Sequence, residues 1–186
     1  MHQLLVPLLL LFTIACGDGI STSNEEAFPD VNLDSLEVDK TKTWIHISKS
    51  KRVLALMEDT HLLKRYPVVL GFNPTDDKLR EGDGCTPEGT FKIRDLYPHR
   101  SWSKFIWIDY PNDASWEKHE AAKAGGSIPA ESAIGGEVGI HGVPAGSDFL
   151  ITMKEDWTLG CISLKNDDVD ELYKYVQQGT TIVIEK

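Results

Sequence analysis

Two stretches, GIHG at residues 139–142 and DWTLGCISL at residues 156–164, decide the fold and the chemistry expected of this chain. In each stretch a glycine adjoins a reactive side chain, His141 or Cys161, and apolar residues alternate nearby. This pattern is typical of side chains presented at the ends of two neighbouring strands. Because a cysteine attacks a carbonyl only as the thiolate, it needs a nearby group that accepts its proton. The sequence therefore predicts a Cys161 nucleophile with His141 as its base.

Apolar residues alternate with a period of two on both sides of this site, which predicts a mainly β domain. Two short helices are expected, one at residues 115–124 and one that begins at Asn166 and is ended by Gly179. Residues 72–86 show no apolar period and are expected to form a long loop. One β-sandwich-like or barrel-like sheet is the simplest architecture for the expected strands, at residues 44–47, 52–57, 62–70, 90–94, 104–109, 138–141, 161–164 and 181–184.

A chain of 186 residues with 41% hydrophobic content can bury one core, so a single domain is predicted at residues 41–186. Residues 17–40 contain seven acidic residues and one basic residue, Lys40, and are predicted to be an acidic flexible tether. The tether carries −6 of the formal net charge of −10, which leaves −4 on the rest. Because the sequence has no basic patch, nucleic acid is not an expected partner.

An apolar run at residues 4–15 that is followed by Cys16 predicts a lipoprotein export signal at residues 1–16. The run is too short to span a bilayer as a mature helix. In this interpretation Cys16 becomes the lipidated N-terminus, and the domain is exported and anchored to a bacterial membrane on its periplasmic side. A conventional secretory signal with an incidental cysteine is the alternative, because such segments are loosely specified.

The two site stretches resemble the catalytic domain of the L,D-transpeptidases, the YkuD-type family of peptidoglycan enzymes, whose signature is His-Gly, a variable loop and Ser/Thr-x-Gly-Cys. GDGCTPEG at residues 82–89 and Gly-Thr at residues 179–180 also fit the family, so the resemblance covers residues 43–186. The DWT-x-GCI wording and YPN at residues 110–112 are most similar to the YafK-like branch. Many relatives have His and Arg where this chain has Leu159 and Ser163, so the substrate contacts of those side chains are not transferred.

The resemblance implies a single L,D-transpeptidase-like domain in which Cys161 forms an acyl-enzyme and His141 acts first as base and then as acid. It also implies that the backbone carbonyl of Gly142 orients the imidazole. Amides around Gly160 and Cys161 are expected to donate to the oxyanion that acyl transfer creates. The implied partner is a peptidoglycan stem peptide, a tetrapeptide in which a diamino acid precedes a terminal D-alanine, and no cofactor is implied.

Four further residues are candidate substrate contacts. Trp157 stands within the motif and forms either a wall of the cleft or part of the core. Thr158 either hydrogen-bonds near the cysteine or only suits a strand. Asp83 and Thr86 belong to the loop at residues 81–89, which either flanks the cleft or only makes a turn.

Several alternatives stay open at the level of the sequence. Cys85 and Cys161 are the two cysteines left for the domain, and a disulfide between them is compatible with an oxidising compartment. A metal site is disfavoured, because the chain lacks the close Cys pairs that are typical of closed zinc sites. An amine acceptor would give transpeptidation, whereas water would give carboxypeptidase or endopeptidase action, including release of a lipoprotein joined to the wall. The alternative from another class is a non-catalytic wall-binding module.

Overall fold

The computed structural model describes residues 31–186, so the predicted signal with Cys16 and the tether up to residue 30 lie outside the described residues. The remaining part of the predicted tether is packed onto the domain. Leu33 begins the short 3-10 helix η1 (Leu33–Ser35) and is fully buried in the core. Lys64 donates a hydrogen bond to the carbonyl oxygen of Val31 at 3.0 Å. The folded domain therefore begins before the predicted boundary at residue 41, because an apolar side chain in the acidic segment is buried in the core.

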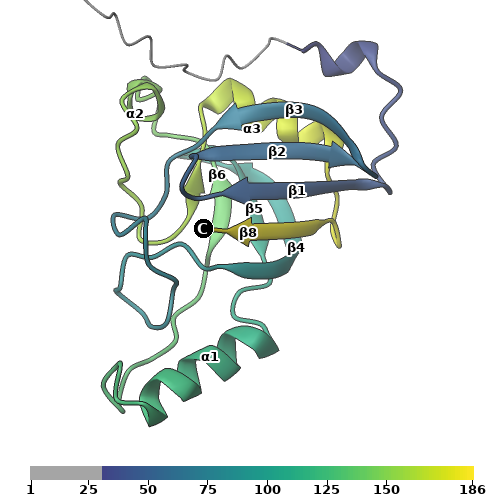
Figure 1. The fold of residues 1–186 in the computed structure, drawn as a ribbon. Helices are drawn as coiled ribbons and strands as arrows, with labels where there is room; N and C mark the ends of the chain where they lie inside the picture. Colours follow the sequence, from purple (N-terminus) through teal and green to yellow (C-terminus); the bar gives the residue numbers. More distant parts are fainter. Residues whose placement is uncertain (1–30) are drawn as a thin grey trace, which may run out of the picture.

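Eight strands form one curled sheet in the order β3-β2-β1-β8-β4-β5-β6-β7 (Figure 1). The pairs β1–β8 and β6–β7 are parallel, and the other neighbouring strands are antiparallel. This sheet confirms the predicted mainly β fold. Its strands are β1 (Thr43–Ser48), β2 (Val53–Glu58), β3 (His61–Pro67), β4 (Gly89–His99), β5 (Ser103–Ile108), β6 (Gly139–His141), β7 (Ile162–Ser163) and β8 (Thr181–Glu185).

Strand β4 belongs to both halves of the sheet and bends between them. Its first residues, Gly89–Lys92, pair with β8, whereas residues from Ile93 onward pair with β5. A β-bulge lies between Ile93 and Asp95, at the start of the second part, and a bulge bends a strand and increases its twist. The sequence predicted this strand only as far as residue 94, because Asp95 and Pro98 are unfavourable in strands.

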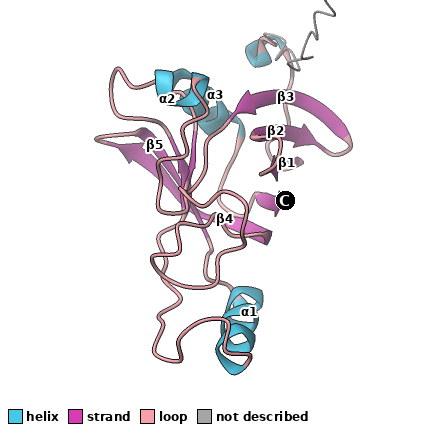
Figure 2. Cartoon of the chain, turned by 60° about the vertical axis from the view of Figure 1, so that its left-hand side comes forward, coloured by secondary structure: helices cyan, strands magenta, loops and turns pink. Residues whose placement is uncertain are grey.

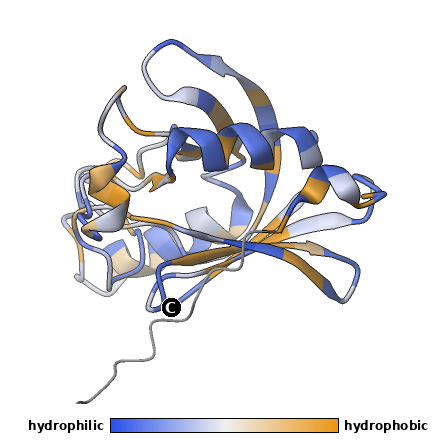
Figure 3. Ribbon diagram, turned by 90° about the horizontal axis from the view of Figure 1, so that it is seen from above, coloured by the Kyte–Doolittle hydropathy of each residue, from blue (hydrophilic) through white to orange (hydrophobic). Residues whose placement is uncertain are grey.

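The core lies between the two halves of the sheet, with α3 (Asn166–Tyr175) in the concavity (Figure 2). Alternate residues of the central strands point into it, and Ile45, Ile47 and Ile182 are fully buried there. Val169 on α3 is fully buried in the same cluster. Figure 3 shows strands that are hydrophobic along much of their length and hydrophilic at the hairpin ends. The period-two alternation of the sequence therefore reflects burial on one face.

Helix α1 (Asp113–Ala124) lies apart from the sheet and supports the long loop between β3 and β4 (Figure 1). Lys118 forms an ion pair with Asp77 of this loop at 2.5 Å. His119 is 1% exposed, and its Nδ1 lies 2.6 Å from the carbonyl oxygen of Leu79. The predicted helix at residues 115–124 is thus present, and it holds the loop from outside the sheet.

The other helices differ from expectation at their ends. Helix α3 stops at Tyr175 rather than near Gly179, because Val176 is extended and buried in the core. A third, one-turn helix, α2 (Phe149–Thr152), was not predicted. Within residues 31–186, no helix combines the length and the apolar character that a membrane crossing requires.

Candidate active site

The two predicted site stretches form the neighbouring parallel strands β6 and β7. Their register pairs His141 with Ser163. Followed two residues back, the same register places Cys161 beside Gly139. Because side chains alternate along a strand, Cys161 and His141 project from the same face of the sheet. The structure thus places the predicted base at the end of β6 and the predicted nucleophile directly before the adjacent strand β7.

The His141 ring is 1% exposed, and its Nδ1 lies 2.6 Å from the carbonyl oxygen of Gly142. A carbonyl oxygen can only accept, so Nδ1 carries the hydrogen and Nε2 is left as the proton acceptor. Ser163 donates to the same carbonyl at 3.2 Å. The N–H of Gly142 donates to the carbonyl oxygen of Trp102 at 3.0 Å. The backbone of Gly142 therefore fixes both the tautomer and the orientation of the imidazole.

Aromatic rings enclose the His141 imidazole on three sides. Trp102 stacks on it with ring centroids 4.4 Å apart, and Phe105 lies nearly parallel to it at 5.9 Å. Trp157 meets it edge to face at 5.7 Å. A Cβ on Gly139 would lie 2.5 Å from the Phe105 ring, so only glycine leaves room for this packing. Trp102 and Phe105 could not be selected from the sequence, because both lie on the β4–β5 hairpin, far from the two site stretches along the chain.

Both members of the Cys161 and His141 pair are uncharged at rest. Burial lowers the pKa of His141 to about 4, although its hydrogen bond to Gly142 acts in the opposite direction. Burial raises the pKa of the Cys161 thiol to about 11, and a hydrogen bond with the Gly139 backbone and the charge of Lys78 oppose this effect. At neutral pH the thiol therefore keeps its proton until attack, when the imidazole can accept it.

The turn before Cys161 is fixed by Thr158 and Gly160. The Thr158 hydroxyl donates to the carbonyl oxygen of Cys161 at 2.7 Å and accepts from the N–H of Gly160 at 3.2 Å. Gly160 has a φ of +140°, and a Cβ there would lie 2.6 Å from the carbonyl oxygen of Cys85. This position therefore requires glycine. Because the Gly160 N–H donates to Thr158 here, its role as an oxyanion donor stays a prediction.

Both cysteines of the described domain are free thiols. Cys161 donates to the carbonyl oxygen of Glu137 at 3.6 Å, and Cys85 donates to the carbonyl oxygen of Asp83 at 3.5 Å. The structure therefore contains two separate thiols at these positions in place of the disulfide that the sequence left open.

Three of the four predicted substrate contacts are engaged by the protein itself. Thr86 is fully buried and accepts a hydrogen bond from the N–H of Gly71 at 3.1 Å. Thr158 is also buried and makes the two bonds of the cysteine turn. Both hydroxyls therefore bind backbone groups, that of Thr158 next to the cysteine, and a contact of either threonine with substrate stays a prediction. Asp83 is mostly buried and accepts hydrogen bonds within its own loop.

Trp157 combines the two roles between which the sequence could not decide. Its ring packs against the small cluster of Val69, Val143 and Ile151. The same ring contacts His141 edge to face, as described above. Its buried Nε1 has no hydrogen-bond partner among the described residues. Trp157 is therefore part of the core and also a wall of the site.

Two charged residues near the site were not recognised in the sequence. Asp156 opens the DWT stretch and accepts hydrogen bonds from the N–H of Leu70 at 2.8 Å and from Nε of Arg52 at 3.1 Å. Lys78 is 6% exposed and forms an ion pair with Asp83 at 2.9 Å. A lysine within a polar loop carries no sequence signal of burial, so Lys78 could not have been found in this way.

Comparison with known proteins agrees with this geometry. A sequence model of the YkuD L,D-transpeptidase catalytic domain matches residues 42–184. The helical cell shape determining protein Pgp2 from Campylobacter jejuni is similar in structure, with a TM-score of 0.59 and 22% identity over 77% of this chain and 47% of that chain. Bd1075 from Bdellovibrio bacteriovorus gives a TM-score of 0.56 with 19% identity over 77% of this chain and 48% of that chain. An L,D-transpeptidase from Mycobacterium smegmatis gives 0.51 with 14% identity over 78% of this chain and 59% of that chain.

The chain spans about half the length of the first two of these structures, and at these identities the likeness concerns the fold. A search of curated proteins found no match to the sequence. The family match covers most of the chain and includes both strands of the site. The chain therefore belongs to the L,D-transpeptidase catalytic domain family of the YkuD type.

Proposed function

We propose that this chain is a cysteine-dependent L,D-transpeptidase that acts on peptidoglycan stem peptides in cell wall remodelling through an acyl-enzyme on Cys161. The observation that carries the proposal is the fixed neutral imidazole of His141. Its Nδ1 lies 2.6 Å from the carbonyl oxygen of Gly142, which leaves Nε2 to accept the thiol proton. Membership of the family supports the stem peptide as substrate.

In the first half-reaction, Sγ of Cys161 attacks the carbonyl carbon of the third stem residue, and the thiol proton moves to Nε2 of His141. The C–N bond to the terminal D-alanine then breaks, and the imidazolium returns this proton to the leaving amine. In the second half-reaction an amine attacks the thioester, and its proton passes through His141 to the departing thiolate. Water in the place of the amine would instead give a carboxypeptidase or an endopeptidase.

The test incubates the full chain with a purified tetrapeptide stem, with and without an amine acceptor, and identifies the products by mass spectrometry. We expect release of D-alanine and a cross-linked product, and a tripeptide would assign the hydrolytic alternative. Cys161→Ala should abolish both, whereas Cys85→Ala should retain them, because the Cys85 thiol is buried and lies outside the pair with His141. Equal loss in both variants would contradict a nucleophilic Cys161.

A carbapenem separates an inactive wall-binding module from an enzyme whose acceptor is missing from the assay. Its strained ring is an acyl donor, so it should add its mass to Cys161 in the intact chain. A chain that forms neither product nor adduct would support the binding module.

We further propose that the chain is exported and held at the periplasmic side of the membrane by a lipid on Cys16. The apolar run at residues 4–15 directly before this cysteine supports the proposal. Palmitate labelling in the producing bacterium should be lost in Cys16→Ser. An unlabelled protein in the soluble fraction would support a conventional secretory signal.

A further inference from the structure

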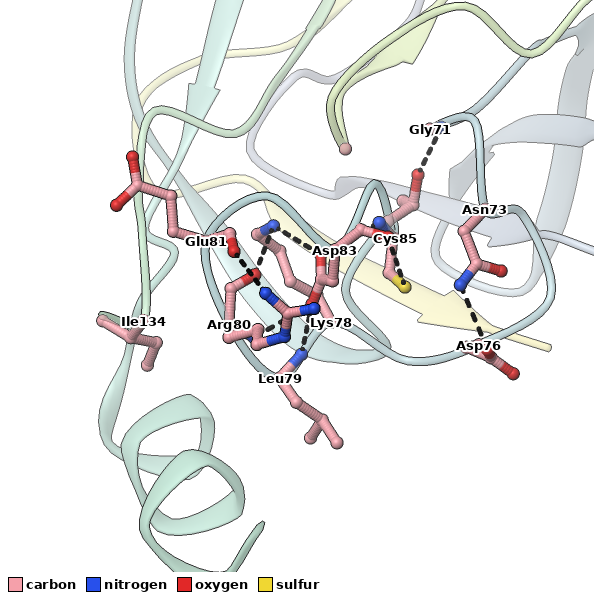
Figure 4. A network of polar contacts seen from close by, with 12 residues as sticks. Gly71, Asn73, Asp76, Lys78, Leu79, Arg80, Glu81, Asp83, Cys85 and Ile134 are labelled. Carbon is pink, nitrogen blue, oxygen red and sulfur yellow. Dashed lines mark hydrogen bonds and ion pairs between the residues drawn. The ribbon is translucent and has the colours of Figure 1, made fainter. Parts of the chain in front are cut away.

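A buried lysine lies behind the nucleophile, in the loop between β3 and β4. Nζ of Lys78 lies 2.9 Å from Oδ1 of Asp83 and donates to the carbonyl oxygen of Arg80 at 3.2 Å (Figure 4). The same Nζ is 3.7 Å from the position that a Cβ would take on Gly160, the residue before Cys161. The ammonium group therefore reaches from the loop to the turn that carries the nucleophile.

The carboxylate that pairs with Lys78 is itself committed to the backbone. Asp83 accepts hydrogen bonds at 2.8, 2.9 and 3.0 Å from three N–H groups of its own loop, those of Leu79, Arg80 and Cys85 (Figure 4). Burial alone would raise the pKa of Asp83, but these bonds and the bond from Lys78 hold it below its ordinary value. Burial of an ammonium group is unfavourable unless it is paired, and this carboxylate supplies the partner.

The loop that carries the pair is anchored on its outer side. The N–H of Glu81 donates to the carbonyl oxygen of Ala133 at 2.8 Å, in the segment that leads to β6. The carbonyl oxygen of Leu79 lies 2.6 Å from Nδ1 of His119 on α1. Because this loop is anchored, the ammonium group of Lys78 does not have to move when a negative charge forms nearby.

The titratable groups around the Cys161 thiol are His141 on β6, Glu137 two residues before β6, and Lys78, Asp83 and Cys85 in the loop. The imidazole is neutral at pH 7, and burial raises the pKa of the Cys85 thiol to about 11, so neither carries charge. The charge of Lys78 lowers the pKa of Cys161, and that of Glu137 raises it. Glu137 is exposed and screened by water, whereas Lys78 is buried, where charges interact more strongly.

We propose that Lys78 is a positioning residue of the acyl-transfer site, whose buried ammonium, held by Asp83 behind Gly160, stabilises the negative charge that forms on the sulfur of Cys161. This inference rests on the proposed role of Cys161 as the nucleophile. The loop between β3 and β4 thus supplies a fixed positive charge to the site, while His141 supplies the base.

The test compares two substitutions that break the same ion pair. Lys78→Met removes the positive charge, and Asp83→Asn removes the negative charge that balances it. If the pair only holds the loop, both changes should alter the Cys161 thiol in the same direction or leave it unchanged. If Lys78 acts through its charge, Lys78→Met should raise the pKa of the thiol and Asp83→Asn should lower it.

The measurement is the rate of alkylation of Cys161 by iodoacetamide between pH 7 and 10 in the full chain, read from the Cys161 peptide by mass spectrometry. Below the thiol pKa, each unit of pKa changes the thiolate fraction tenfold, and the opposing change in nucleophilicity leaves about three- to fourfold in rate. We expect Lys78→Met to be slower than wild type, by about three- to fourfold for each unit by which the thiol pKa rises, and Asp83→Asn to be faster. Lys78→Arg, which keeps the charge, should recover most of the rate.

Two outcomes would overturn the inference: equal slowing in Lys78→Met and Asp83→Asn, or alkylation profiles that superimpose on wild type. If circular dichroism shows that Asp83→Asn does not fold, the test compares the alkylation rates of Lys78→Met and Lys78→Arg instead. Equal rates in these two variants would reject a role for the charge. Alkylation needs no stem peptide. If only the proposed function fails, turnover of the stem peptide is absent while the variants differ in alkylation as expected. If only this inference fails, turnover is present while the expected differences in alkylation are absent.

Discussion

His141, the proposed base, carries a neutral imidazole, and burial keeps the Cys161 thiol protonated. With the pKa of His141 lowered to about 4, the acceptor form is already present in mildly acidic solution. Acylation of the free enzyme should therefore rise through about pH 4 and level off toward neutrality, with an apparent value that belongs to the coupled pair.

In His141→Gln the Cys161 thiol must ionise alone, and its pKa is raised to about 11. We expect its labelling by iodoacetamide at pH 7 to fall on the order of 10²- to 10⁴-fold, the usual contribution of a general base, and to keep climbing into the alkaline range. Peptide mass spectrometry across pH measures both profiles. Superimposable curves would show that His141 does not receive the thiol proton.

The residues of this site divide into those that local sequence can identify and those that only the fold assembles. The neighbouring placement of Cys161 and His141 was predictable, because each lies next to a glycine at a strand end, and their roles stay proposals. Phe105 and Lys78 were not, because their roles arise from contacts across the fold with β6 and with the cysteine turn. The bond of Thr86 to the N–H of Gly71 could not be foreseen, because a hydroxyl that binds a buried backbone N–H looks the same in sequence as one that faces a ligand.

At the level of elements, the β4–β5 hairpin supports the base through its turn. The carbonyl oxygen of Trp102 accepts from Gly142, and its ring stacks between His99 and His141, with both centroid distances 4.4 Å. Trp102→Ala keeps the carbonyl but exposes the imidazole to water. Burial is the main cause of the low pKa of His141. In this variant the pH at which the reactivity of Cys161 reaches half of its plateau should therefore move from about 4 toward 6.5.

The matched control for the hairpin is Trp102→Phe, which keeps an aromatic ring on the imidazole and should leave the limb near pH 4. Titration of the His141 ring by NMR measures the pKa of His141 without any substrate. An unchanged titration in Trp102→Ala would mean that Phe105 and Trp157 alone keep water away from the base.

The elements with a regular apolar period were predicted from sequence, whereas those shaped by tertiary contacts were not. Strand β1 alternates over most of its length, β2 lies where it was expected although its first four residues are all buried, and both expected longer helices are present. The second half of β4 was missed, because its polar residues and Pro98 are accommodated by pairing with β5. Helix α3 was predicted too long, because burial of Val176 in the core outweighs continuation of the helix.

The whole molecule includes the end of the acidic segment, which the sequence placed outside the domain. Leu33 is fully buried in the core, whereas Leu36 in the same segment is 43% exposed. We expect Leu33→Ala to lower the free energy of unfolding by about 2 to 5 kcal/mol and Leu36→Ala to change it by about 0.5 kcal/mol or less. Urea denaturation of both variants measures the difference. Similar small effects would show that this segment does not contribute to the core.

Strand β8 (Thr181–Glu185) pairs with β1 on one side and with β4 on the other, so these five residues link β1, β2 and β3 to β4, the strand that continues into the other half of the sheet. A ribosome must therefore translate codon 185 before β1 and β4 can be joined through the complete strand β8. Until then the nascent chain already contains Cys161 and His141, but the edges of β1 and β4 that pair with β8 have no partner strand. The part of the sheet that holds Cys161 and His141 is thus joined to β1, β2 and β3 by a segment that contributes no side chain to the proposed chemistry.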